Sequence, residues 1–261
     1  MHMVKNRVHG LKVFLLVSCW LMALKLIKDG KVLTPSTQKE RELEAFCLKL
    51  ATPITFEWIN GQYFLHSDIP KEKPIGIKID EELARHEAYF KKSSIQKELL
   101  ARAIGVKGPY RPEVVDLTAG LLGDSLLFLS FGCRVRAVER NPIVAFLIES
   151  SLLNSSHPFL ERFSFESMSA ADFLEKNSGE ILYFDPMFED ENEKTAPRKE
   201  MRIFRSLIGE DADAKDIFKK ALSKNQRRVV VKRPKLSQKL GDEKPLQYVG
   251  KSTRYDVYLS V

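Results

Sequence analysis

Apolar and polar positions follow a strand-then-helix pattern in the central part of this chain of 261 residues. The apolar pair Val114-Val115 ends in Asp116 and is followed by a glycine-containing turn and an apolar segment at 126–131. A second β-type run, 134–138, ends in Glu139. This order predicts a strand, a glycine turn, a helix and a second strand, which is how a nucleotide-binding type of α/β unit begins.

Strands and helices continue to alternate after this unit. A helix is expected from Pro142 to about Leu153, because proline suits the first helical turn. Further strands are expected at 163–166, 181–184 and 228–231, helices at 170–175, 198–208 and 211–222, and a final antiparallel hairpin at 248–249 and 254–261. The alternation predicts a mostly parallel, seven-stranded sheet with helices on both faces.

The preceding region has a different pattern, which predicts a small α+β lobe over residues 34–80 before the main domain at 81–261. Asn60-Gly61 is a strong signal for a two-residue β-hairpin. The elements expected around it are a helix at 39–50, strands at 54–59, 62–66 and 75–79, and a mostly helical, basic segment at 81–104.

Residues 1–33 form a leader whose role the sequence leaves uncertain. An uncharged apolar run at 13–24 follows several basic residues, as in a signal peptide. However, Lys25 and Lys28 follow the run at once, and it is too short to span a bilayer as a helix. We therefore favour a cytoplasmic protein with no membrane partner over an exported one.

Charge and cysteine content narrow the function further. Lys and Arg number 42 against 35 Asp and Glu, a formal net charge of +7, which favours an anionic partner, nucleic acid first. A generic basic surface would give the same excess. Cys19, Cys47 and Cys133 have neither disulfide-framework nor zinc-ligand spacing, so we expect no metal.

The turn at 116–124, DLTAGLLGD, lacks the G-x-G-x-x-G pattern that seats a pyrophosphate. This favours a nucleoside cofactor without phosphates, such as S-adenosylmethionine, over the nicotinamide dinucleotide of an oxidoreductase. Gly120 and Gly123 would allow close approach of the cofactor. Asp116 could hold its ammonium group, and Glu139 could accept from both ribose hydroxyls. The alternative is that these are ordinary turn glycines and a surface acid.

Asp185-Pro186-Met187-Phe188 directly follows the strand expected at 181–184. The Asp185 carboxylate and the Pro186 carbonyl can both accept hydrogen bonds from an exocyclic amine, which aims its lone pair at a methyl donor. Phe188 could stack on a purine. These groups suit SN2 methyl transfer, in which positioning supplies much of the rate. A plain Asp-Pro turn is the alternative.

Several segments in this order resemble the RsmJ family, the small-subunit ribosomal RNA (guanine-N2)-methyltransferases. They are VVDLTAGLLGDS, GCRVRAVERNP, YFDPMF, KEMRIFRSLIG, RRVVVKRP and RYDVY, and the resemblance covers about residues 75–261. It implies a class I, Rossmann-like methyltransferase fold with S-adenosylmethionine as cofactor. The implied reaction in rRNA processing is methyl transfer to the exocyclic N2 amine of a guanosine in small-subunit rRNA.

The resemblance also implies site residues. Cofactor contacts would fall on Gly123-Asp124, Glu139-Arg140, Met168-Ser169 and Asp185. The family usually has G-L-G-R-D where this chain has 120–124, GLLGD, so one glycine is displaced. That change supports one alternative, a non-catalytic RNA-binding or ribosome-assembly protein on a degenerate methyltransferase fold. A methyltransferase acting on DNA or protein would share most of these residues.

Two basic sets are candidates for RNA contact, and phosphate contacts of this kind position a substrate without reading its sequence. Ligands of open α/β sheets bind at the carboxyl ends of the strands, so we expect Lys232 and Arg233 beside Asp116, Glu139 and Asp185. The sets are Lys194, Arg198, Lys199, Arg202 and Arg205, and Arg227, Arg228, Lys232, Arg233, Lys235 and Lys239. The oligomeric state and the modified guanosine stay open.

Overall fold

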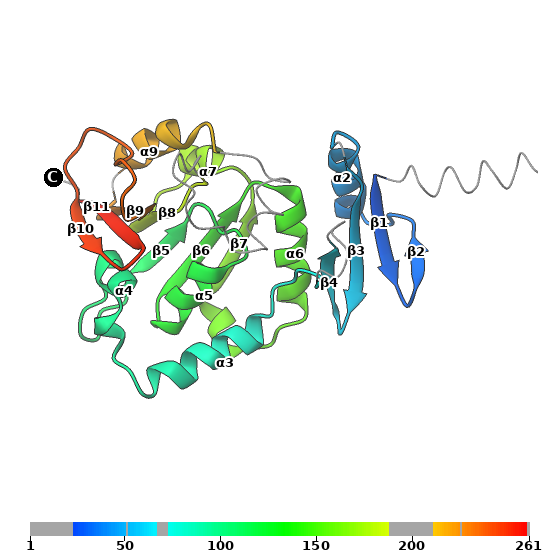
Figure 1. The fold of residues 1–261 in the computed structure, drawn as a ribbon, viewed down its shortest axis with the longest axis horizontal. Helices are drawn as coiled ribbons and strands as arrows, with labels where there is room; N and C mark the ends of the chain where they lie inside the picture. The colour runs from blue at the N-terminus through cyan, green and yellow to red at the C-terminus, as the bar shows by residue number, and fades with distance from the viewer. Residues whose placement is uncertain (1–22, 51, 67–72, 188–210, 225, 260–261) are drawn as a thin grey trace, which may run out of the picture. The chain divides into compact units, whose positions relative to one another are not determined.

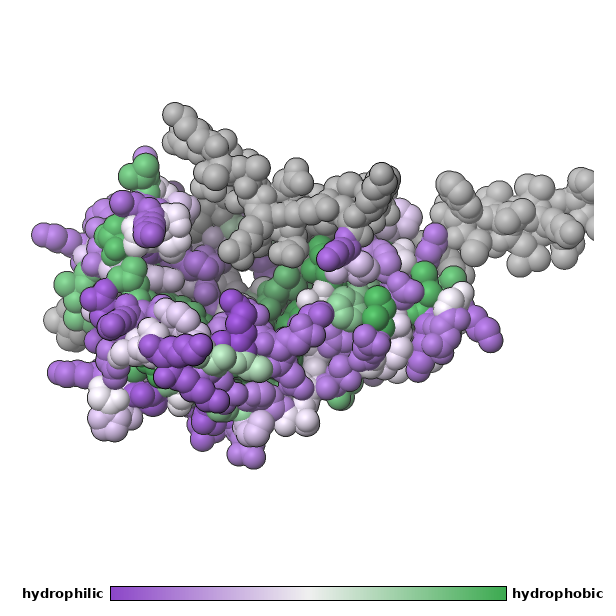
Figure 2. Space-filling view, turned by 60° about the horizontal axis from the view of Figure 1, so that its bottom comes forward, coloured by the Kyte–Doolittle hydropathy of each residue, from purple (hydrophilic) through white to green (hydrophobic). Residues whose placement is uncertain are grey.

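The computed structural model describes residues 23–50, 52–66, 73–187, 211–224 and 226–259. The chain divides into two compact units between Gly76 and Ile77. Hydrophilic residues cover most of the described surface that is visible in Figure 2. No helix in the described ranges is long and apolar enough to cross a membrane.

The first unit is a four-stranded sheet in the order β2-β1-β3-β4, with one helix, α2 (Figure 1). Its elements are β1 (Leu24–Lys28), β2 (Lys31–Leu33), α2 (Gln38–Cys47), β3 (Ile54–Ile59) and β4 (Gln62–His66). Asn60 and Gly61 have φ of +50° and +91°, as the predicted hairpin turn requires. β1 and β2 lie within the leader that the sequence left unassigned, because Leu24 and Leu26 are needed to fill the core of this unit.

One sequence-based expectation near the junction is wrong. Residues 75–79 form no strand, since Ile75 makes only a single bridge to Leu65 and Ile79 already begins helix α3 (Ile79–Phe90). Three acidic residues in the first turn favour that helix start. The expectation of a mostly helical segment at 81–104 is confirmed, with the helical residues divided among α3, the short 3₁₀ helix η1 (Ile95–Lys97) and α4 (Leu99–Ile104).

The second unit contains a seven-stranded sheet in the order β10-β11-β9-β8-β5-β6-β7, which confirms the predicted fold (Figure 1). Neighbouring strands from β9 to β7 are parallel, and β11 is antiparallel to both β9 and β10. The strands are β5 (Glu113–Asp116), β6 (Arg134–Glu139), β7 (Phe163–Ser167), β8 (Ile181–Phe184), β9 (Arg228–Pro234), β10 (Leu246–Val249) and β11 (Thr253–Leu259).

Helices lie on both faces of this sheet (Figure 1). They include α5 (Gly123–Ser130), α6 (Pro142–Leu153), η2 (Pro158–Arg162), α7 (Ala170–Lys176) and α9 (Ala214–Leu222). Phe173 of α7 and Phe218 of α9 share one apolar cluster with Val115, Leu182 and Val229 of the sheet. The helix expected at 198–208 lies outside the described residues.

The strand order reverses between β5 and β8, because β5 continues to β6 on one side and pairs with β8 on the other. In open α/β sheets such a reversal opens a crevice at the carboxyl ends of the strands. β5 ends at Asp116 and β8 is followed by Asp185, so the two predicted carboxylates flank this point.

Candidate active site

A series of hydrogen bonds connects the ends of β5 and β8. Asp116 is 1% exposed, and its Oδ2 accepts the Ser125 hydroxyl at 2.6 Å while its Oδ1 accepts the Thr118 amide at 3.1 Å. Thr118 Oγ1 in turn accepts the amide N–H of Asp185 at 2.8 Å. Thr118, two residues after β5, therefore fixes the backbone at the start of the Asp-Pro-Met-Phe segment, a role that the sequence did not indicate.

Burial makes a charge on Asp116 costly. It raises the pKa of this carboxyl from its ordinary 3.8 to about 7, the Ser125 hydrogen bond opposes the shift, and the nearby Asp124 and Asp185 carboxylates add to it. A positive charge at this place would favour the ionised form and be attracted by it. The floor of the crevice thus suits a cationic ligand.

The glycine turn has two residues in left-handed backbone conformation. Gly120 has φ +50°, and Leu122, which precedes α5, has φ +64°. A leucine in this region costs roughly 1–2 kcal/mol, so the displaced glycine leaves a locally strained turn. Gly123 itself begins α5, and a Cβ there would meet no atom within 4 Å. Open space therefore lies beside the start of this helix, where a ligand could approach.

Glu139, at the end of β6, faces this turn. Its Oε2 accepts the Gly120 amide at 3.0 Å, and its Oε1 accepts the Asn141 amide at 2.7 Å. The side chain is 8% exposed, and burial raises its pKa although both amides oppose the shift. The two amides fix the orientation of the carboxylate, and each oxygen keeps a second lone pair for a hydroxyl donor.

The next residue, Arg140, forms ion pairs with two acidic residues of the segment before α9. Its Nη1 lies 2.9 Å from both carboxylate oxygens of Asp213, and its Nη2 contacts Asp211. Asp211 also accepts the amide of Met187 at 2.7 Å. Arg140 therefore ties the end of β6 to the segment before α9, and Asp211 ties that segment to the residues after β8.

Met168 and Ser169 follow the end of β7, and their side chains have structural partners. The Ser169 hydroxyl caps α7, accepting the Asp172 amide at 3.0 Å and donating to the Asp172 carboxylate at 2.6 Å. Met168 packs against the apolar cluster of α7 and α9. Their contact with a cofactor stays a prediction.

Asp185 lies at the rim of the crevice with 35% of its side chain exposed. Its Oδ2 is 2.8 Å from Nζ of Lys232, the β9 residue that follows the last pair between β8 and β9. Burial raises the pKa of Asp185, and the Lys232 ammonium opposes that shift. Pro186 is buried. Phe188 lies outside the described residues, so its stacking role stays a prediction.

Lys232 also contacts Asp124 of α5, with 2.9 Å between Nζ and Oδ2. The same oxygen accepts the hydroxyl of Tyr183, a fully buried residue of β8, at 2.5 Å. Sequence reasoning missed Tyr183, although a tyrosine within a buried apolar strand needs a partner for its hydroxyl. Asp124 and Asp185 are thus brought together by a lysine that we expected to hold phosphate.

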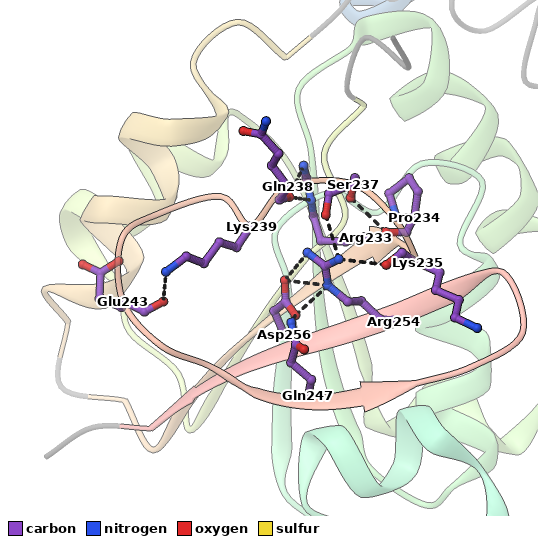
Figure 3. A network of polar contacts seen from close by, with 10 residues as sticks. All are labelled: Arg233, Pro234, Lys235, Ser237, Gln238, Lys239, Glu243, Gln247, Arg254 and Asp256. Atoms are coloured by element: carbon purple, nitrogen blue, oxygen red, sulfur yellow. Dashed lines mark hydrogen bonds and ion pairs between the residues drawn. The ribbon is translucent and has the colours of Figure 1, made fainter. Parts of the chain in front are cut away.

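The basic set around β9 does not form one surface. Side chains alternate along a strand, so Arg233 points to the opposite face from Lys232, and its Nη2 donates to the Gln238 carbonyl at 2.7 Å (Figure 3). Arg228 begins β9, at the far end of the strand from the crevice, and donates to the Ala103 carbonyl at 2.9 Å. The expectation that Arg233 lies on the carboxylate rim is therefore wrong.

A buried arginine of β11, Arg254, donates hydrogen bonds to the backbone of the loop after β9. Arg254 donates to the carbonyls of Lys235 at 2.9 Å and Ser237 at 2.7 Å, and it pairs with buried Asp256 (Figure 3). Lys239 donates to the Asp242 carbonyl at 2.7 Å. The other basic set, between 194 and 205, lies outside the described residues.

The charges at the crevice favour a positively charged ligand without phosphates. Asp116, Asp124 and Asp185 interact electrostatically with one another, and Lys232 contacts two of them. A pyrophosphate would meet these carboxylates, whereas a sulfonium or ammonium would be attracted. Among the described residues, no cluster of histidine, cysteine and acidic side chains could hold a metal ion.

Comparisons with known proteins agree with this chemistry. A family model described as "Putative SAM-dependent methyltransferase" matches residues 56–260. A ribosomal RNA small subunit methyltransferase J of Laribacter hongkongensis is 42% identical over 184 residues, 67% of this chain and 65% of that protein. One of Actinobacillus pleuropneumoniae is 36% identical over 202 residues, 74% of this chain and 80% of that protein. The crystal structure of a SAM-dependent methyltransferase from Neisseria gonorrhoeae has a TM-score of 0.60 and 26% identity, covering 90% of this chain and 95% of that one.

Proposed function

This chain belongs to the family of SAM-dependent methyltransferases whose model it matches, and we propose that it methylates the exocyclic N2 amine of a guanosine in small-subunit ribosomal RNA. The relatives named ribosomal RNA small subunit methyltransferase J support the substrate class. One observation carries the reaction type. Asp185 is held beside the cofactor turn by Thr118 and Lys232, at the reversal of strand order. Such a substrate would place the enzyme in the cytoplasm.

The residues present fit S-adenosylmethionine. When bound, it would supply a methyl carbon on a positively charged sulfur, and that sulfur would keep the electron pair of the carbon–sulfur bond as the amine nitrogen takes the methyl group. The turn from Asp116 to Asp124, with Gly120 and Gly123, would form the cofactor floor. Glu139 would accept from the ribose hydroxyls. We assign the adenosine side to residues that follow β6 and β7, namely Arg140, Met168 and Ser169.

The Asp-Pro-Met-Phe segment would hold the guanine. The Asp185 carboxylate and the Pro186 carbonyl would accept the two amine hydrogens, and Phe188 would stack on the base. The nitrogen lone pair forms the new bond to carbon, and the nitrogen then loses a proton. Asp185 can take that proton, since burial raises its pKa, and pass it to water.

The proposal is tested by transfer of labelled methyl to small ribosomal subunits from cells that lack this protein. We expect label in the RNA, and a fall of about 100-fold or more for Asp185→Ala, the size expected when one positioned polar group is removed from a reacting site. Asp242→Ala, an exposed acid in the loop after β9, is the matched control and should behave as wild type. Wild-type activity in Asp185→Ala would refute the assigned role.

The strained glycine turn supports one alternative, a non-catalytic RNA-binding or assembly protein on a degenerate methyltransferase fold. Leu122 in left-handed conformation is the observation that favours it. A wild-type protein that binds the small subunit but transfers no label and binds no S-adenosylhomocysteine would establish this alternative.

A further inference from the structure

The sheet register places Lys232 beside Asp185. β8 and β9 are parallel, and their last pair is Phe184 with Val231. Lys232 and Asp185 are the next residues on the two strands, so they meet where the pairing ends. On its other side Lys232 is paired with Tyr255 of β11. A one-residue shift of β9 would turn this lysine to the other face of the sheet.

The Lys232 ammonium joins carboxylates from two different elements. Nζ lies 2.8 Å from Oδ2 of Asp185, after β8, and 2.9 Å from Oδ2 of Asp124, in the first turn of α5. Burial alone would lower the pKa of Lys232, but the two carboxylates raise it overall, so the ammonium stays charged. The lysine thus connects the cofactor turn to the segment assigned to the substrate.

This arrangement does not suit phosphate binding. Two of the three ammonium donors are directed at carboxylates at hydrogen-bonding distance. A phosphate approaching Nζ would come close to both negative charges, and the repulsion would offset its attraction to the lysine. Lys232 therefore has a different role from that of a lysine exposed on an RNA-binding surface.

We propose that Lys232 is a positioning residue, which fixes the Asp185 carboxylate against Asp124 so that the substrate amine and the methyl donor meet in one geometry. This inference rests on the proposed methyl transfer. Because Lys232 contacts Oδ2 of Asp185, the other oxygen, Oδ1, accepts the hydrogen bond from the substrate amine. Without the ammonium the two carboxylates repel each other, and Asp185 leaves its position. A displacement of about 1 Å can lower a rate roughly 100-fold.

The pH dependence of the rate separates this role from a purely structural one. The groups that interact electrostatically with Asp185 are Asp116 of β5, Asp124 of α5, Tyr183 of β8, Lys232 of β9, Tyr255 of β11 and Asp211 before α9. Lys232 is the cation in this set, and it favours the ionised form of Asp185. Replacing it with methionine should therefore move the acid limb of the kcat profile to higher pH.

The test compares Lys232→Met and Lys232→Arg in the full chain with wild type. We expect Lys232→Met to lower kcat about 30- to 100-fold, while KM for the small subunit and Kd for S-adenosylhomocysteine change less than about threefold. Lys232→Arg keeps the charge and should retain kcat within about tenfold of wild type. Lys107→Met is the control, because this exposed lysine precedes β5 at the opposite end of the strands.

Three outcomes would overturn the inference. One is an unchanged kcat in Lys232→Met. Another is a raised KM with normal kcat and a weaker salt dependence, which would indicate a phosphate contact. The third is an equal loss in both variants together with a lowered Tm and an unmoved pH profile, which would indicate a structural role alone. A wild-type protein without methyl transfer would instead refute the proposed function, and this inference with it.

Discussion

Arg254→Met tests how the loop after β9 is held. Arg254 is 7% exposed and Asp256 is fully buried, and Nε of the arginine lies 2.9 Å from Oδ1 of the aspartate. Nη1 of the same side chain donates to the carbonyls of Lys235 and Ser237 (Figure 3). Methionine fills a similar volume without a charge, so the substitution removes the ion pair and both carbonyl contacts while most of the packing is kept.

The expected cost is large because one charge stays buried. Breaking a buried pair by removing one partner costs about 3–5 kcal/mol. Asp256 keeps a hydrogen bond from Gln247 Nε2 at 2.8 Å, and the loop carbonyls can turn to water, so we expect a loss within that range. With about 2–4 °C per kcal/mol for a domain of this size, Tm should fall by roughly 6–20 °C.

Urea unfolding of the full chain, followed by circular dichroism, measures this loss. Residues 77–261, the second unit, contain no tryptophan, so tryptophan fluorescence should change little with this loss. Asp256→Asn in the Arg254→Met background should restore part of the stability, because the buried charge is then gone. A loss below about 1 kcal/mol, or no recovery in the double variant, would refute the reasoning.

Two further predictions concern the crevice. Glu139→Gln places an amide donor against the N–H group of Gly120 or Asn141, so it should weaken S-adenosylhomocysteine binding about 10- to 100-fold, as measured by calorimetry. Glu161→Gln, at an exposed position, is the control and should leave this affinity unchanged. Equal affinities in the two variants would exclude Glu139 from the site. Between about pH 4 and 7 the folded protein keeps a proton on Asp116 that the unfolded chain releases, so rising pH should destabilise the protein without bound cofactor. Asp116→Asn should remove up to about 4 kcal/mol of this pH dependence, as measured by urea unfolding at several pH values. An unchanged slope of unfolding free energy against pH would contradict the raised pKa.

In the second unit, the sequence alone determined the order of the strands and the acidic residues at their ends. Asp116, Glu139 and Asp185 each follow or end an apolar run, and parallel strands bring such ends to one edge of the sheet. The hairpin at Asn60-Gly61 likewise depends on two adjacent residues with φ above zero. These features are local, or follow from a general rule of strand topology, and could therefore be predicted.

Only the tertiary structure decided which side chains meet. Lys232 lies 108 positions after Asp124 in the sequence, yet the two side chains are in contact, whereas the adjacent Arg233 faces the other side of the sheet. Tyr183 donates its buried hydroxyl to Asp124, a contact between distant parts of the sequence. Strand β1, in a segment that resembled a leader, pairs with β3 of the small sheet. Partners of this kind depend on strand register and on packing between distant segments. A basic residue in the sequence therefore predicts a charge, but whether that charge meets RNA or a neighbouring carboxylate is set by the fold.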